Sequence, residues 1–322
     1  MWTSWTRSGT GDSWSHYGGT YGLGRSRIGV DESGNIYACT ADHRDPIIYK
    51  FVQNGTTGLE KIAQFNFASF NTGNTNDWMS NRGIYFVNGD MFLCAGYNTK
   101  QFFKWTAGNY SSDPEVFLNQ NLTPGPMGVG PNYMYWVGNP NAQYLQRMNL
   151  DGTSSETVCN INGGSGSNPR FTGVFSDGTY FYCVVLDHTD QSDGQNNHRT
   201  KIFKVPETAS NVDLTANDDY LYHTYQTRLK RNNENIWDND LIWYDNGYIY
   251  AFTNWGSADD AIPYDIIKIS TTTPVEEIVF SSDTSQFGWS YYQGSMIVKD
   301  NYCWFLTGTS GQDHSGDLMK LP

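Results

Sequence analysis

Aromatic and polar side chains crowd the long segments between the predicted strands, where they could bind a ligand or a partner. Flat aromatic rings beside Asn, Gln and Asp suit sugars, because the CH faces of a sugar stack on the rings and its hydroxyls need polar partners. The same residue types concentrate in protein–protein interfaces, and they could also pack the loops against one another. The candidate residues for binding a ligand or a partner are Trp14, His16, Tyr17, His43, Arg44, Trp78, Trp237, Trp255, Trp289, Tyr291 and Tyr292.

Three arginines, Arg27, Arg82 and Arg170, stand near the start of three predicted innermost strands. If their side chains reach a central channel, they could bind an anion such as a carboxylate or a sulfate. They could instead pair with carboxylates around the mouth of that channel. An anion site is therefore one of two interpretations of these residues.

Residues 187–198 form a segment rich in oxygen donors. Asp187, Asp190 and Asp193 are candidate ligands for Ca²⁺, a hard cation that takes about six to eight oxygens. Their spacing matches no EF-hand loop, and a solvated polar loop is the alternative interpretation. We therefore predict no cofactor, with Ca²⁺ as the candidate ion.

Motifs of common hydrolases and nucleotide-binding enzymes are missing from the sequence, which has no Gly-x-Ser-x-Gly elbow and no phosphate loop. Loop carboxylates such as Asp238, Asp259 and Asp313 could form a catalytic pair. Such a pair needs a particular separation between the two carboxyl groups, which the sequence cannot supply.

A repeat in the sequence indicates the strands that must position these candidate residues. A basic residue in an alternating segment recurs six times, at intervals of 54, 43, 57, 64 and 52 residues. A tight polar turn and an aromatic-rich strand precede each copy, and such intervals are typical of one four-stranded propeller blade with variable loops. The sequence predicts an all-β, six-bladed β-propeller that forms a single domain over residues 1–322. The repeated basic residues are Lys50, Lys104, Arg147, Lys204, Lys268 and Lys320.

The outer strand of each blade follows its basic strand in five copies, and the sixth copy lacks one. The expected outer strands span residues 59–65, 114–118, 156–161, 212–215 and 275–280. We predict that residues 1–8 supply the closing outer strand of the last blade, because an exposed strand edge needs a cover. The alternative is that Trp2 and Trp5 pack a loose terminus. Residues 216–240 are expected to be a loop insertion, which could hold a short helix or an extra hairpin.

Three of the five cysteines lie five residues after a turn glycine, at Cys39, Cys94 and Cys183, and Trp136 and Phe252 fill that place in two other blades. A position that accepts Cys, Trp or Phe is a buried packing position. Equivalent positions in different blades should lie too far apart to bridge, so we predict no disulfides. Reduced core thiols fit a protein that folds in a reducing compartment.

The formal net charge is −13, from 20 Lys and Arg against 33 Asp and Glu. A nucleic acid or an anionic membrane surface would be repelled over most of such a surface, so neither is an expected partner. The sequence has no apolar run of membrane-spanning length and no secretory leader pattern. We expect synthesis in a cytoplasm, and the alternative is that a leader has been removed.

The stretch Ile28-Gly-Val-Asp31-Glu-Ser-Gly34-Asn35-Ile36-Tyr37 resembles the first hairpin of NHL-type and related six-bladed propellers. The resemblance implies the fold. RNA-reading members of that group have basic faces, from which this acidic chain departs. Lactonase and gluconolactonase relatives hold a central metal with acidic and amide side chains, and no residues here can be matched to those ligands.

The expected function is that of a non-enzymatic structural or interaction propeller. A low charged fraction and many Asn, Thr, Ser, Gly and aromatic residues resemble surface components of viruses and phages, such as decoration, knob or host-recognition proteins. The expected partner is another virion protein or a cell-surface glycan, and the expected location is the virion exterior. The alternative is a hydrolase or lyase that acts on a glycan or lactone, with a bound Ca²⁺.

Overall fold

The computed structural model shows short β-strands joined by turns and loops. No α-helix occurs among the described residues, and no helix there is long and apolar enough to cross a membrane. The structure describes residues 3–5, 28–39, 46–52, 58–65, 81–95, 99–121, 127–138, 143–161, 170–187, 199–216, 218–225, 242–252, 265–281, 296–300, 302–308 and 316–321.

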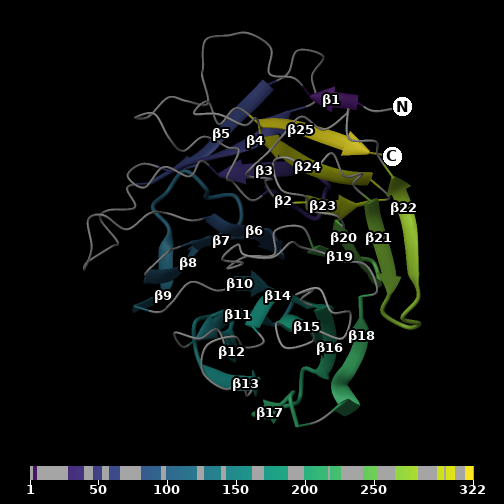
Figure 1. Ribbon diagram of the computed structural model, residues 1–322. Helices are drawn as coiled ribbons and strands as arrows, with labels where there is room; N and C mark the ends of the chain where they lie inside the picture. Colours follow the sequence, from purple (N-terminus) through teal and green to yellow (C-terminus); the bar gives the residue numbers. More distant parts are fainter. Residues whose placement is uncertain are drawn as a thin grey trace. The chain divides into compact units, whose positions relative to one another are not determined.

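The chain divides into two compact units. Unit 1 comprises residues 1–121 and 287–322, and unit 2 comprises residues 122–286. The described strands form six sheets, three in each unit, which are antiparallel except for one parallel pair in sheet 3 (Figure 1). Five sheets have the four strands of a propeller blade, and one gains a fifth strand.

Unit 1 contains three sheets, which we number 1, 2 and 6 in chain order. Sheet 1 is β2 (Ile28–Val30), β3 (Ile36–Cys39), β4 (Ile47–Val52) and β5 (Gly58–Gln64). Sheet 2 is β6 (Asn81–Val87), β7 (Asp90–Ala95), β8 (Thr99–Trp105) and β9 (Glu115–Asn121). Sheet 6 is β23 (Met296–Lys299), β24 (Tyr302–Gly308), β25 (Gly316–Leu321) and β1 (Thr3–Trp5).

Unit 2 contains sheets 3, 4 and 5. Sheet 3 is β10 (Met127–Val129), β11 (Tyr133–Gly138), β12 (Tyr144–Asn149), β13 (Glu156–Asn160) and β17 (Val212–Asp213). Sheet 4 is β14 (Arg170–Ser176), β15 (Tyr180–Asp187), β16 (Arg199–Pro206) and β18 (Leu221–Thr224). Sheet 5 is β19 (Ile242–Asp245), β20 (Tyr248–Phe252), β21 (Asp265–Ser270) and β22 (Glu276–Ser281).

The turn chemistry explains the inner hairpins. Asn88 and Gly89 both have positive φ, at 53° and 80°, and Asn246 and Gly247 have φ of 47° and 81°. Two such residues in a row make the tight turn whose twist matches a hairpin, and Asn-Gly adopts it at little cost. Glycine is also needed at Gly29 in β2, because a Cβ there would lie 2.3 Å from the Ile84 carbonyl oxygen of β6. The innermost strands of sheets 1 and 2 therefore touch backbone to backbone.

Neighbouring sheets within each unit bury apolar faces against each other. One core cluster joins sheets 1 and 2, a second joins sheets 3 and 4, and a third joins sheets 4 and 5. Trp105, Tyr135 and Tyr182 are each at most 1% exposed. Aromatic side chains of the second and third strands therefore supply much of the apolar area that holds the sheets face to face.

The predicted pairing of the first residues with the last strand is confirmed. β1 lies antiparallel to β25, with Thr3 opposite Lys320 and Trp5 opposite Leu318 (Figure 1). This pairing gives sheet 6 its fourth strand and covers the edge of β25. The predicted all-β propeller class is likewise confirmed, while closure of all six sheets into one ring within a single domain stays a prediction.

The predicted outer strand of the fourth copy is wrong. Val212–Asp213 (β17) pairs parallel with β13 of sheet 3, and Leu214 behind it is 1% exposed in the core between sheets 3 and 4. The outer strand of sheet 4 is Leu221–Thr224, which follows a 3-10 helix at Asp218–Tyr220. The segment 216–240 is therefore not wholly a loop insertion, and its residues 226–240 lie outside the described residues.

The predicted equivalence of the three turn-spaced cysteines is also wrong. Cys39 and Cys94 lie two residues after the aromatic that faces the repeated basic residue, whereas Cys183 lies one residue after Tyr182. The aromatic residue that faces the basic residue lies three residues after the turn glycine in sheets 1 and 2, but Tyr182 lies four residues after Gly178, which shifts Cys183 by one place. Because side chains alternate along a strand, Cys183 points to the opposite face of its sheet. Trp136, one residue after Tyr135, shares the place of Cys183.

Candidate functional site

The predicted partner-binding residues lie outside the described residues, from Trp14 to Tyr292. So do Arg27, Asp190 and Asp193. Arg82 and Arg170 lie on the innermost strands β6 and β14, and Asp187 ends β15 opposite Arg199. The described part of the chain holds no group of three or more His, Cys, Asp or Glu that could bind a metal ion. The anion and calcium sites thus stay predictions.

The repeated basic residues have register partners on both neighbouring strands of their own sheet. In four sheets, the basic residue has an aromatic residue opposite it on the second strand and a glutamate opposite it on the outer strand. These rows are Tyr37, Lys50 and Glu60; Phe92, Lys104 and Glu115; Tyr135, Arg147 and Glu156; and Tyr250, Lys268 and Glu277. The sequence shows the basic residue, and a glutamate 9–11 residues after it is the signal that would have shown its partner.

Arg147 holds sheets 3 and 4 together. Its guanidinium donates to Glu156 Oε1 from Nε (2.9 Å) and Nη2 (2.7 Å), and it stacks on the Tyr133 ring at 4.4 Å. Nη1 donates to the backbone carbonyl of Glu207, which belongs to sheet 4. Arg147 is 5% exposed, and its hydrogen bonds hold the pKa of Glu156 below its usual range. The bonds to Glu156 and the stacking on Tyr133 hold the guanidinium in place within sheet 3, and the bond to the Glu207 carbonyl joins it to sheet 4.

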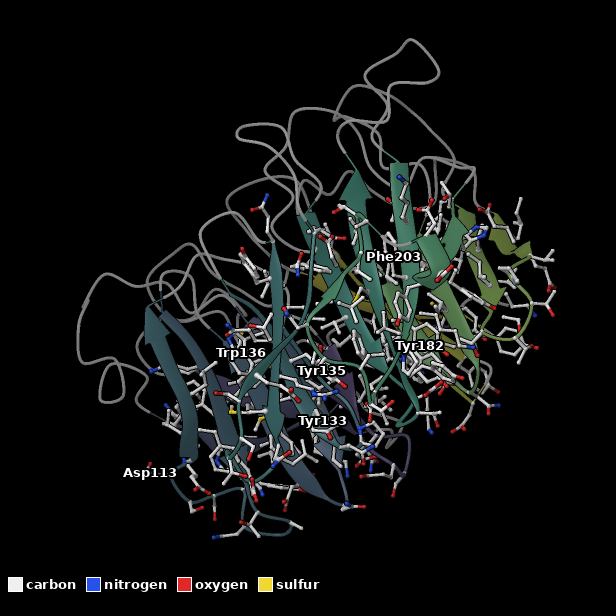
Figure 2. The ribbon with its side chains drawn as sticks, turned by 90° about the horizontal axis from the view of Figure 1, so that it is seen from below. Asp113, Tyr133, Tyr135, Trp136, Tyr182 and Phe203 are labelled. Atoms are coloured by element: carbon white, nitrogen blue, oxygen red, sulfur yellow. The ribbon has the colours of Figure 1, made fainter. Side chains whose placement is uncertain are left out.

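Glu207 is the second polar connection between sheets 3 and 4. Its Oε1 accepts from the hydroxyls of Tyr135 (2.8 Å) and Ser176, and its Oε2 accepts from Asn132 Nδ2 (2.8 Å). Glu207 is only 7% exposed. Burial and the adjacent carboxylate raise the pKa of Tyr135 well above its usual range. Since three donors already engage this carboxylate, the arrangement fixes structure rather than preparing a free acid or base. Figure 2 shows Tyr133 and Tyr135 close together in sheet 3.

Lys204 repeats the same connection between sheets 4 and 5. Its Nζ donates to the Thr271 carbonyl at 2.7 Å and lies over the Tyr180 ring at 4.4 Å. Tyr222 reaches across as well, donating to the Ser270 carbonyl at 2.6 Å. In sheets 3 and 4 the repeated basic residue is thus a strut to the backbone beside the next sheet, whereas Lys104 and Lys268 pair with Asp90 and Glu277 of their own sheets.

A histidine–glutamate pair joins the outer strands of sheets 4 and 5. His223 Nε2 lies 2.8 Å from Glu276 Oε1, and the imidazole meets the Tyr225 ring edge-on at 5.3 Å. Burial, with a smaller effect from Glu276, raises the pKa of Tyr225 well above its usual range. The pair connects β18 to β22, and β22 also carries the exposed apolar residues Ile278 and Val279.

The outer strand of sheet 5 differs from the other outer strands. Sheets 1 to 5 share a β-bulge in this strand, at Ile62, Phe117, Val158, Tyr222 and Val279. The first four bulge residues are buried or half-buried, but Val279 is 42% exposed. Ile278 beside it is 61% exposed, and Val275 just before the strand is 65% exposed. We call Val275, Ile278 and Val279 the apolar edge.

The apolar edge combines exposed β-branched side chains with an outermost strand. β22 ends the order of sheet 5, so its outward backbone groups have no partner within that sheet. Exposed apolar edge strands are sites where another chain can add or pack. Glu277 on the same strand is bonded by Lys268 at 3.2 Å, with its side chain 62% exposed. The apolar edge is therefore the candidate functional site among the described residues.

No protein-family profile matches the sequence, and no curated protein matches it. Among solved structures, the chain is similar to the PQQ-bound aldose sugar dehydrogenase of Streptomyces coelicolor, with a TM-score of 0.56 and 9% identity, over 95% of this chain and 96% of that one. It is also similar to a DUF4623 family protein of Bacteroides eggerthii, with a TM-score of 0.50 and 10% identity, over 100% of this chain and 75% of that one. These likenesses support the β-propeller fold and concern the fold alone.

Proposed function

We propose that this chain is a non-enzymatic β-propeller that binds another structural protein, as a component of the surface of a virus or phage particle. The observation that carries the proposal is the apolar edge on β22, where Ile278 is 61% and Val275 65% exposed. The virion assignment rests on the composition of the chain, and the predicted loop aromatics would serve a partner protein or a cell-surface glycan.

The other sheets support this interpretation by contrast. Each of sheets 1 to 4 turns the bulge residue of its outer strand inward, and sheet 3 also covers its edge with β17. Sheet 5 leaves the same position in water, and a bulged apolar edge that is not covered costs solubility. A partner that packs on Ile278 and Val279 would remove this apolar area from water.

The experiment that tests the role is quantification of the chain in purified particles by mass spectrometry. Fixed stoichiometric copies support the proposal, and absence from particles contradicts it. For the edge, we expect Ile278→Lys to weaken particle binding about 30-fold, which corresponds to the burial of one Ile side chain at about 2 kcal/mol. Tyr144→Ser, at an exposed tyrosine of β12, is the matched control and should bind as the unchanged protein does.

The second candidate function is a hydrolase or lyase for a glycan or lactone, with Ca²⁺ held in the predicted oxygen-rich loop. The chemistry that favours it is the set Asp187, Asp190 and Asp193, because hard cations prefer carboxylate oxygens. Purified monomer would then turn over a sugar lactone or an oligosaccharide, and a calcium chelator would abolish the turnover. Turnover by a chain that is missing from particles would replace the structural role with the enzymatic one.

A further inference from the structure

We propose that Cys159 and Cys183 form a disulfide when the folded protein meets a mild oxidant such as hydrogen peroxide. The two sulfurs lie 3.7 Å apart, one on β13 of sheet 3 and the other on β15 of sheet 4. Both side chains are fully buried in the core cluster between these sheets. The inference does not depend on the proposed function.

Two irregularities of the chain bring these thiols together. The β-bulge at Val158 turns two consecutive residues, Val158 and Cys159, into the same core cluster. The extra residue between Gly178 and Tyr182 moves Cys183 out of the place that Cys39 and Cys94 share and onto the face toward sheet 3. Neither irregularity alone would place the sulfurs in contact.

The covalent bond requires only a small movement. A disulfide holds its sulfurs about 2.05 Å apart, so the pair must close by about 1.7 Å. Rotation about the χ1 angles can supply part of that movement within a core that already keeps the sulfurs in van der Waals contact. The other three cysteines, Cys39, Cys94 and Cys303, lie on sheets 1, 2 and 6.

An oxidant reaches the pair most directly from the outer edge of sheet 3. Cys159 pairs in register with Val212, and the β17 strand that covers it spans two residues. The Asn160 side-chain oxygen beside it is buried and has no hydrogen-bond partner among the described residues, which weakens this edge. A two-residue strand opens at low cost, so Cys159 becomes accessible without global unfolding.

The reaction balances in two steps. The Cys159 sulfur attacks a peroxide oxygen, the O–O bond breaks, and sulfenic acid and one water form. The Cys183 thiol then attacks the sulfenic sulfur, the S–S bond forms, and the hydroxyl leaves as water with the thiol proton. The two thiols lose two electrons, which reduce one hydrogen peroxide. Burial and the neighbouring Cys159 sulfur raise the pKa of the Cys183 thiol, so this thiol is protonated before the second step and loses its proton as it attacks.

The test is a thiol count on the folded protein after brief treatment with hydrogen peroxide. Alkylation in denaturant should find three of the five thiols, and peptide mass spectrometry should find Cys159 linked to Cys183. Dithiothreitol should restore all five, and the oxidised form should unfold at a temperature about 5 °C higher than the reduced form. Five remaining thiols, or a link between other cysteines, would overturn the proposal.

Two variants make the result specific. Cys159→Ser should keep its four thiols through the same treatment, whereas Cys39→Ser should still lose two. If Cys159→Ser loses two thiols as readily as the unchanged protein, the assigned pair is wrong. Because the main readout uses the unchanged protein, a variant that fails to fold leaves the test intact.

Discussion

Glu207 binds side chains from two sheets with a single carboxylate, and its backbone carbonyl accepts from Arg147. A substitution that removes the charge of the side chain but keeps its shape changes the carboxylate contacts and leaves the backbone contact in place. Substitution of Glu207 therefore measures how much these hydrogen bonds contribute to the stability of the contact between sheets 3 and 4.

We predict that Glu207→Gln lowers the free energy of unfolding by about 2 kcal/mol, because a neutral amide replaces a buried carboxylate that accepts from three donors. Urea denaturation followed by tryptophan fluorescence measures the change. Glu115→Gln, at an exposed glutamate of β9, is the control and should change stability by less than about 0.5 kcal/mol. Equal effects of the two variants would show that Glu207 has no special role.

Arg147 and Lys268 occupy the same place in two sheets but differ in burial. Arg147 is 5% exposed, whereas the Lys268 and Glu277 side chains are 26% and 62% exposed. We predict that Arg147→Met costs about 2 kcal/mol and Lys268→Met less than about 1 kcal/mol, because exposed ion pairs contribute little. Chemical denaturation of both variants under one buffer condition tests the contrast.

The pair of Arg147 and Glu156 makes the free energy of unfolding depend on pH in the acid range, and the direction follows from the lowered pKa of Glu156. The folded pKa of Glu156 is lowered by its hydrogen bond to Arg147, so the contribution is present above the unfolded pKa and is lost as the pH falls through the folded value. The difference between Arg147→Met and the unchanged protein should shrink in acid. A difference that grows in acid would contradict the assigned pairing.

At this scale the sequence predicts the repeated basic residues but not what they bind. Lys204 and Arg147 each donate to the backbone of the next sheet, and no spacing within one repeat encodes that contact. Glu207 is unpredictable for the same reason, since its partners Asn132 and Tyr135 lie more than 70 residues away.

Among the elements, β1 is a three-residue strand that forms the outer edge of sheet 6. We predict that a variant lacking residues 1–6 is less stable by roughly 2 kcal/mol and aggregates on heating, because the edge of β25 loses its hydrogen-bonded cover. Thermal unfolding and light scattering measure both effects. A synthetic peptide of residues 1–8 should restore part of the lost stability, and an unchanged melting temperature in the truncated protein would contradict the prediction.

The hairpins were predictable because Asn-Gly turns have a strong local preference, as Asn88-Gly89 and Asn246-Gly247 show. The strand β17 was not, because an alternating segment such as Val212 to Leu214 suits the edge of either neighbouring sheet. Tertiary packing decides between them: Leu214 is buried against sheet 3, and its amide donates to the Asn160 carbonyl at 2.9 Å.

For the whole molecule, buried phenols determine how the protein responds to alkali. Burial is the largest cause that raises the pKa values of Tyr37, Tyr135, Tyr182 and Tyr225 above the usual value of 10. Their contribution to stability is complete below the unfolded pKa and is lost as the pH rises beyond it toward the folded values.

We therefore predict that the free energy of unfolding falls steeply above about pH 10, and that phenolate absorbance rises together with unfolding. Tyr225→Phe should weaken this dependence, because it removes one such phenol without changing the ring. Ionisation of all the tyrosines well before unfolding would show that these phenols are not protected by the fold.

Because the chain passes through β17 of sheet 3 before it forms β18 of sheet 4, the two sheets can be completed only one after the other. After β16 the polypeptide leaves sheet 4, joins sheet 3 at Val212–Asp213 and only then returns as β18. During synthesis, a nascent chain that has emerged as far as Pro206 therefore carries two incomplete sheets, and residues 207–224 finish both. A pause of the ribosome just before this segment would lengthen the life of an intermediate with two open edges.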